Sequence, residues 1–170
     1  LLAALEGRGH AAMTPIEVGG GSAGGAGGAG VGDSRLPMPE TTLRGFAWQM
    51  LQGLAGLHEL PRPLLHRDLK PSNILLHSSG RLVISDFGCS TVLPSACHCV
   101  HGYKGTAAYM SPERMKGEGY GLTSDIWSFG LILAECILHH LPFAAYSPKQ
   151  ADDGAIFEYH AKMTREKVEM

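Results

Sequence analysis

The most constraining feature of this sequence is a pair of short β-rich runs that have a turn between them and polar residues at both outer ends. Residues 74–76 and 82–84 are aliphatic, and the His-Ser-Ser-Gly stretch at 77–80 is typical of a tight turn. Antiparallel strands joined in this way bring their outer ends to one edge. We therefore expect Asn73 and Asp86 to lie side by side.

Two long segments have helical patterns. Residues 43–57 carry apolar side chains at three- and four-residue steps, which predicts an amphipathic helix over about 40–60. Residues 124–138 are apolar nearly all round, which predicts a helix buried on every side. With a further β-rich piece at 64–65 and a last helix over 155–168, the pattern indicates an α+β fold that is mainly helical.

Residues 19–32 are almost wholly glycine, alanine and serine, with no side chain large enough to repay the entropy of ordering them. We interpret residues 19–37 as a flexible insertion within one domain spanning 1–170. A phosphate-binding glycine loop is the alternative. It requires a strand before it and a Lys-Ser/Thr pair after it, and the sequence predicts neither.

Composition and charge argue against some classes of binding partner. The formal net charge is −2, which gives no basic surplus for nucleic acid or an anionic membrane. Glu135 interrupts the longest apolar run, so no membrane span is expected. The four cysteines do not suggest a disulfide framework and the first residues do not resemble a signal peptide, so we expect a cytoplasmic or nuclear protein.

Two motifs carry the chemistry. The run His66-Arg67-Asp68-Leu69-Lys70-Pro71-Ser72-Asn73 resembles the catalytic loop of protein kinases, and Asp86-Phe87-Gly88 resembles their metal-binding triplet. The run 105–113, Gly-Thr-Ala-Ala-Tyr-Met-Ser-Pro-Glu, is similar to the end of a kinase activation segment. The resemblance implies a protein kinase fold, of which this chain holds mainly the helical C-lobe and lacks the N-lobe.

The resemblance also implies a role for each matching residue. Asp68 would orient the substrate hydroxyl, Lys70 would contact the γ-phosphate of ATP, and Thr106 would hold both side chains. Asn73 and Asp86 would bind Mg²⁺ through oxygen. The residues implied for ATP and Mg²⁺ binding are Lys70, Ser72, Asn73, Leu75 and Asp86. Those implied for structural support are His66, Arg67, Phe87, Gly88, Glu113 and Asp125, the last of which would bond to the catalytic-loop backbone.

Among the kinases, the amino-acid sequence resembles the mitogen-activated protein kinase kinases over residues 43–143. The runs HRDLKPSN, SDFG, GTAAYMSPER and SDIWSFGLILAEC carry this likeness. It implies transfer of the γ-phosphate of ATP to Ser/Thr, or to Thr and Tyr, of a downstream protein kinase. It also implies an upstream kinase that activates this one.

The activation segment departs from that family. The two positions where a Ser or Thr is expected hold His98 and Gly102. The remaining candidate phosphate acceptors are Ser90, Thr91, Ser95 and Tyr103. A phosphate on one of them would pair with Arg67 and order the loop.

A second oddity of the loop is its Cys97-His98-Cys99-Val100-His101 run. Thiolate and imidazole ligands in this spacing suit a soft metal or a redox role. The alternative is a variable loop without a ligand. We expect the pair at 139–140, two histidines beyond the apolar helix, to lie on the surface.

Two functions from different classes follow. The first is a Ser/Thr or dual-specificity kinase whose complete domain supplies the N-lobe; the chain by itself would then turn over little. The second is a truncated kinase-like scaffold that binds a partner without catalysis. The polar set Asp68, Lys70, Asn73 and Asp86 favours the first, because a scaffold does not require it.

Overall fold

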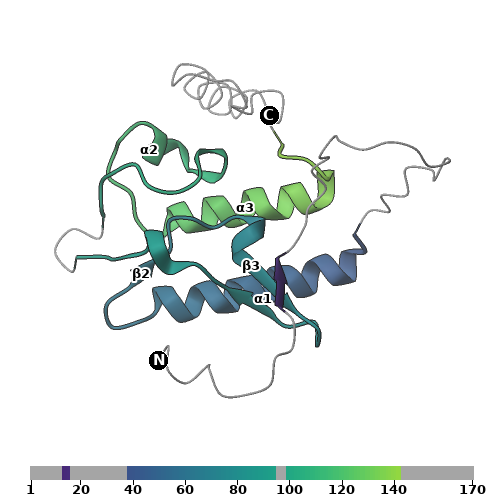
Figure 1. The fold of residues 1–170 in the computed structure, drawn as a ribbon. Coiled ribbons are helices and arrows are strands. Elements are labelled where there is room, and N and C mark those ends of the chain that lie inside the picture. Colours follow the sequence, from purple (N-terminus) through teal and green to yellow (C-terminus); the bar gives the residue numbers. More distant parts are fainter. Residues whose placement is uncertain (1–12, 16–37, 95–98, 143–170) are drawn as a thin grey trace.

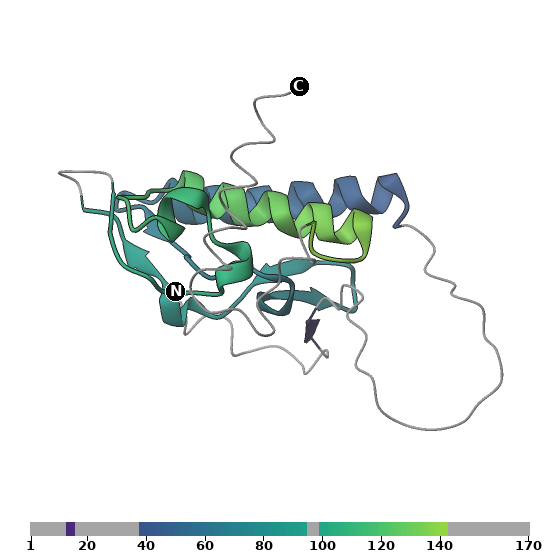
Figure 2. The same ribbon diagram turned by 90° about the horizontal axis from the view of Figure 1, so that it is seen from above.

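The computed structural model describes residues 13–15, 38–94 and 99–142 (Figure 1). Two long helices, α1 and α3, lie side by side and cover one face of a small antiparallel sheet, as the view from above shows (Figure 2). The insertion predicted at 19–37 and the helix predicted at 155–168 lie outside the described residues.

Helix α1 (Glu40–His58) confirms the amphipathic helix predicted from its apolar spacing. Its inner face packs into the main core, whose buried members are Met50, Leu54, Leu69, Ile74, Phe129, Ile132 and Cys136. At Gly53 the helix lies so close to the sheet that a Cβ atom would come within 2.9 Å of Ile84 Cδ1. The hairpin is therefore fixed directly against the helix.

The predicted hairpin is present as β3 (Ile74–His77) and β4 (Leu82–Ile84), in antiparallel register with Ile74 opposite Ile84. Gly80 closes the turn with a φ of +80°, a conformation that glycine adopts without strain. A third strand, β1 (Met13–Pro15), pairs with the outer edge of β3. The expectation of no strand before the glycine-rich segment was therefore wrong. The three residues of β1 are too few to show a strand period.

A second, two-stranded sheet pairs β2 (Leu64–Leu65) with β5 (Thr91–Val92). The sequence predicts β2 but not β5, since two residues carry no periodic signal. An isolated antiparallel bridge joins Val100 to Tyr120. The β2–β5 pairing attaches the chain segments on either side of residues 66–73 to each other, whereas the bridge joins two segments that both follow that loop.

Helix α2 (Pro112–Met115) is a single turn, and α3 (Thr123–Leu138) is the second long helix. The prediction that α3 is buried on every side was wrong, because Ile126, Ile137 and Leu138 are 44%, 55% and 45% exposed. The apolar composition of the helix exceeds the area that the described elements cover. None of the helices among the described residues combines the length and apolarity needed to cross a bilayer.

Candidate active site

Asp68 lies in the loop that follows β2 and is 8% exposed. Its Oδ1 accepts hydrogen bonds from the N–H of Thr106 at 2.8 Å and from the hydroxyl of Thr106 at 2.7 Å. Its Oδ2 lies 3.0 Å from Nζ of Lys70. Burial acts to raise the pKa of Asp68, but these hydrogen bonds and the charge of Lys70 outweigh it and lower that pKa. The carboxyl group is therefore held as a carboxylate.

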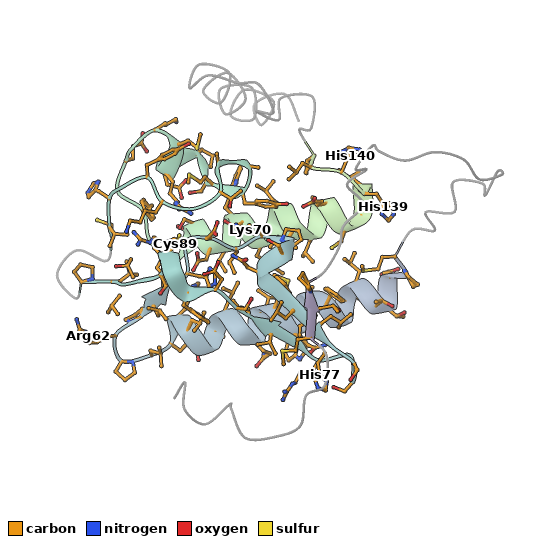
Figure 3. The ribbon with its side chains drawn as sticks, viewed as in Figure 1. Arg62, Lys70, His77, Cys89, His139 and His140 are labelled. Atoms are coloured by element: carbon orange, nitrogen blue, oxygen red, sulfur yellow. The ribbon has the colours of Figure 1, made fainter. Side chains whose placement is uncertain are left out.

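Lys70 completes this cluster. Its Nζ donates to Oγ1 of Thr106 at 2.9 Å, so the hydroxyl of Thr106 accepts from Lys70 and donates to Asp68. Lys70 lies near the centre of the described structure, between the hairpin and α3 (Figure 3). Its side chain is 27% exposed, which leaves it accessible to a ligand. The structure thus brings together three residues that the sequence analysis assigned to one step.

Asn73 ends the short helical turn η2 (Pro71–Asn73), where Pro71 starts the turn. The side-chain nitrogen of Asn73 donates to the carbonyl oxygen of Asp68 at 2.8 Å and approaches its Oδ2 at 3.3 Å. The backbone oxygen of Asn73 accepts from the N–H and the hydroxyl of Ser85, the residue before Asp86. The two outer ends of the hairpin therefore meet, as expected.

Asp86 is exposed and has a left-handed φ of +60°, with its Oδ1 accepting from the N–H of Gly88 at 3.2 Å. Aspartate tolerates this conformation better than bulkier residues do. Within the described residues, no group of three or more His, Cys, Asp and Glu side chains could hold a metal ion. Mg²⁺ commonly takes one or two protein carboxylates with phosphate and water oxygens. The oxygen donors of Asn73 and Asp86 fit that ion.

Asp125 is fully buried on α3 and binds the backbone of the loop that carries Asp68. Its Oδ2 accepts from the N–H of His66 at 2.9 Å, and its Oδ1 accepts from the N–H of Arg67 at 3.0 Å. Oδ2 also lies 3.0 Å from Nε2 of His58, at the end of α1. The sequence analysis missed His58, because one histidine in the last turn of a helix carries no specific signal. Two helices and the loop thus meet at one carboxylate.

The other predicted support residues occupy varied surroundings. The ring of His66 lies 5.1 Å from that of Phe87, edge to face, and Nε2 of His66 is 2.9 Å from the carbonyl oxygen of Ser85. Phe87 is nevertheless 39% exposed, so its packing is incomplete. Glu113 is half-buried in the first turn of α2.

Two further positions expected to meet ATP lie in η2 and in β3. Ser72 is exposed within η2. Leu75 is half-buried in β3, with Val83 opposite it on β4 and Pro15 opposite it on β1. Contact of Leu75 with adenine stays a prediction.

Arg67 does not meet a carboxylate in the described part of the chain. Its Nε donates to the carbonyl oxygen of Cys89 at 2.5 Å, and a terminal nitrogen lies 3.4 Å from the hydroxyl of Tyr120. Ser90 donates its hydroxyl to the carbonyl of Phe87 at 2.7 Å, and Thr91 lies in β5. As candidate phosphate acceptors, both stay predictions.

Three residues for which the sequence predicts a role in the loop lie outside the described residues, namely Ser95, Cys97 and His98. Cys99 is half-buried and His101 is exposed. At the other end of the structure, His139 and His140 follow α3 (Figure 3). His140 is exposed, as expected, whereas His139 is half-buried.

A second buried carboxylate lies on α3. Oε2 of Glu135 accepts a hydrogen bond from the hydroxyl of Tyr109 at 2.6 Å. Burial raises the pKa of Glu135, and the bond from Tyr109 opposes that shift only in part. Tyr109 lies three residues after Thr106, so this pair connects α3 to the segment that holds Asp68.

Comparison with known proteins identifies the family of the chain. The protein kinase domain family model matches residues 30–169. The chain is 46% identical over 127 residues to the mitogen-activated protein kinase kinase SIPKK of Nicotiana tabacum, covering 75% of this chain and 34% of that protein. It is 46% identical over 107 residues to mitogen-activated protein kinase kinase 2 of Arabidopsis thaliana, covering 63% and 29%. Identity to dual specificity mitogen-activated protein kinase kinase 1 of Dictyostelium discoideum is 43% over 113 residues, covering 66% and 17%.

These relatives confirm the resemblance to the mitogen-activated protein kinase kinases. The chain spans about a third, or less, of the length of the curated relatives named here.

Proposed function

Because the chain belongs to the protein kinase domain family, we propose that it forms the catalytic C-lobe part of an enzyme that transfers the γ-phosphate of ATP to Ser or Thr of another protein. The observation that carries this proposal is the cluster of Asp68, Lys70 and Thr106 beside Asn73. The side chains of Lys70, Thr106 and Asn73 are held there at hydrogen-bond distance from the carboxylate of Asp68. A purely structural loop would not require a lysine and a carboxylate together in this position.

The arrangement suits phosphoryl transfer, a reaction in which positioning and charge neutralisation provide most of the catalysis. Asp68 is kept ionised, so its carboxylate can orient an incoming hydroxyl and accept its proton. Lys70 supplies a positive charge within 3.0 Å of that carboxylate, where the transferred phosphoryl group would pass. Thr106 holds both groups in register.

Asn73 and Asp86 would hold the metal. Mg²⁺, when bound with ATP, neutralises the charge of the phosphate oxygens. Asn73 presents its amide nitrogen to Asp68, which leaves the amide oxygen for a metal ion. Asp86 is exposed at the adjoining end of the hairpin. The bonds between Ser85 and Asn73 fix the spacing of these two side chains.

We further propose a place in a mitogen-activated protein kinase cascade. The curated relatives are named as mitogen-activated protein kinase kinases, and one of them as dual specificity. The substrate of the enzyme to which this chain belongs would then be a mitogen-activated protein kinase, and an upstream kinase would activate that enzyme. Lys70 two residues after Asp68 supports Ser/Thr substrates.

A chimera tests the function directly. Residues 30–169 would replace the matching segment of SIPKK, and transfer of radiolabelled phosphate to a mitogen-activated protein kinase would be measured. We expect activity in the chimera. With Asp68→Asn we expect it to fall about 10²- to 10⁴-fold while ATP affinity is retained.

The exposed Glu59 on the same segment provides a matched control, since Glu59→Gln should leave the rate unchanged. A chimera that is folded and binds ATP but transfers no phosphate would favour the scaffold function. An Asp68→Asn chimera as active as its parent would refute the role of Asp68.

A further inference from the structure

Tyr120 is a buried side chain that no function described so far uses. It is 2% exposed and lies between α2 and α3. Its backbone forms a two-bond bridge with Val100, at 2.8 and 3.0 Å. Its hydroxyl donates to the carbonyl oxygen of Gly102 at 3.0 Å. One residue therefore holds two points of the segment 99–105, which we call the approach segment because it leads directly into Thr106.

Two arginines also converge on Tyr120. A terminal nitrogen of Arg67 lies 3.4 Å from the tyrosine hydroxyl. The guanidinium of Arg114 stacks on the tyrosine ring, 4.9 Å from its centroid, and donates to the carbonyl of Lys104. Tyr120 thus connects the catalytic loop, α2 and the approach segment through neutral acceptors and its ring.

No carboxylate of the described residues lies within ion-pair distance of Arg67 or Arg114. Two guanidinium groups so placed would ordinarily attract an anion such as a phosphate. Here the guanidinium groups donate instead to the hydroxyl of Tyr120 and to backbone carbonyl oxygens. The approach segment is therefore attached to Arg67 and Arg114 without a phosphate.

The backbone of the approach segment fits this arrangement. Gly102 has a φ of +114° and Gly105 a φ of +105°, conformations that residues with a side chain rarely adopt. At Gly105 a Cβ atom would overlap the carbonyl oxygen of Arg67, so the segment runs directly against the catalytic loop. Gly102 also occupies a position where the family resemblance leads us to expect a phosphate acceptor.

We propose that Tyr120 is a positioning residue that holds the approach segment so that Thr106 bonds to Asp68, with no phosphate on that segment. The effect of Tyr120 on catalysis rests on the proposed kinase function, whereas its holding of the approach segment does not. The physical reason is that the hydroxyl of Tyr120 accepts from Arg67 and donates to the carbonyl oxygen of Gly102, which joins the guanidinium of the catalytic loop to the approach segment.

Amide hydrogen exchange of the unphosphorylated 170-residue chain, verified by mass spectrometry, tests the proposal. We expect the N–H of Thr106, which bonds to Asp68, to be protected in this unmodified protein. Tyr120→Phe keeps the ring and removes the hydroxyl, and should speed exchange at Thr106 about tenfold while Leu54 in the core is unaffected. Tyr103→Phe is the matched control, since the one hydrogen bond of the Tyr103 hydroxyl within the described residues is to Met115 Sδ, at 3.5 Å.

A second variant keeps the test decisive if Tyr120→Phe does not fold. Gly102 is exposed and has open space where a Cβ would be, so Gly102→Ser strains only the backbone. It should also speed exchange at Thr106, whereas Gly45→Ser on the exposed face of α1 should not. The Asp68 carboxyl provides a spectroscopic readout, because its pKa should rise when the bonds from Thr106 are lost.

Two results would overturn the proposal. One is an unprotected Thr106 in the unmodified chain that becomes protected after phosphorylation of the segment or in inorganic phosphate. The other is an equal change at Thr106 and Leu54, which would indicate global destabilisation. None of these measurements requires turnover, so a protected Thr106 together with an inactive SIPKK chimera would count against the proposed function and leave the role of Tyr120 standing.

Discussion

Asp125 holds Arg67 in a left-handed backbone conformation. Oδ1 of the buried carboxylate accepts from the N–H of Arg67 at 3.0 Å, and Arg67 has a φ of +69°. A residue other than glycine in that region costs about 1–3 kcal/mol and persists only where its surroundings impose it. The residue before Asp68 is therefore held in place from a helix almost sixty positions away in the sequence.

Asp125→Asn should lower the free energy of unfolding by about 2–3 kcal/mol, because one of two buried N–H groups would then face an amide N–H₂ group instead of an acceptor. Urea denaturation of the 170-residue chain measures this. Glu40→Gln is the control: among the described residues Glu40 forms its ion pair with Arg44, on the exposed face of α1, and the loss of that pair should cost about 0.5 kcal/mol or less. Equal effects of the two changes would contradict the supporting role of Asp125.

Thr106→Val should raise the pKa of Asp68, since it removes the hydroxyl that donates to Asp68 and accepts from Lys70. A lowered carboxyl pKa contributes stability above the unfolded-state pKa, and that stability is lost as the pH falls through the folded-state pKa. The variant should therefore lose less stability on acidification. Carboxyl NMR titration gives the pKa directly.

Thr106→Ser keeps the hydroxyl and serves as the control for that change, with an Asp68 pKa close to that of the parent. If Val and Ser at position 106 gave the same pKa, the hydroxyl would have no part in holding Asp68.

The contribution of Glu135 to stability should depend on pH in the opposite direction. Its pKa is raised, mainly by burial, so its contribution to stability is present below its unfolded-state pKa and is lost as the pH rises through the folded-state pKa. Glu135→Gln should flatten the stability profile in that window and raise stability at neutral pH. Denaturation over a pH series measures this.

Tyr109→Phe removes the 2.6 Å hydrogen bond to Glu135 and should raise the pKa of that carboxyl further. The slope of stability against pH would then extend to higher pH. An unchanged profile in both variants would mean that Glu135 is solvated like a surface residue.

Gly105→Ala should destabilise the chain by at least about 2 kcal/mol, since the methyl group would overlap the carbonyl of Arg67 at a φ of +105°. Gly45→Ala makes the same chemical change on the exposed side of α1, where the added Cβ would have no described atom within 4 Å beyond its chain neighbours and the backbone of its own helix. It should stabilise by about 0.5–1 kcal/mol. Thermal unfolding of both variants checks the contrast, and a similar shift in melting temperature for both would refute the close approach at Gly105.

Much of the architecture was predictable because its signals are local. The apolar spacing of α1 and the turn residues at 77–80 specify elements whose hydrogen bonds lie within a few residues of one another. The meeting of Asn73 with the neighbour of Asp86 follows from the hairpin alone.

The remaining features depend on distant partners. β1 and β5 are strands of three and two residues, and each exists only because β3 or β2 offers it an edge. His58 and Tyr120 have no sequence pattern that distinguishes them, yet they bond to Asp125 and to Gly102. The apolar run of α3 shows that the helix prefers burial, but not which of its sides the rest of the chain covers.

The sequence by itself therefore determined the elements with local hydrogen bonds and the identity of the polar residues in the kinase motifs. Only the tertiary structure decided how Thr106 and Asp125 converge on the loop that carries Asp68. The physical reason is that a hydrogen bond across 38 or 58 positions depends on how whole helices and loops pack, which no local pattern of side chains encodes.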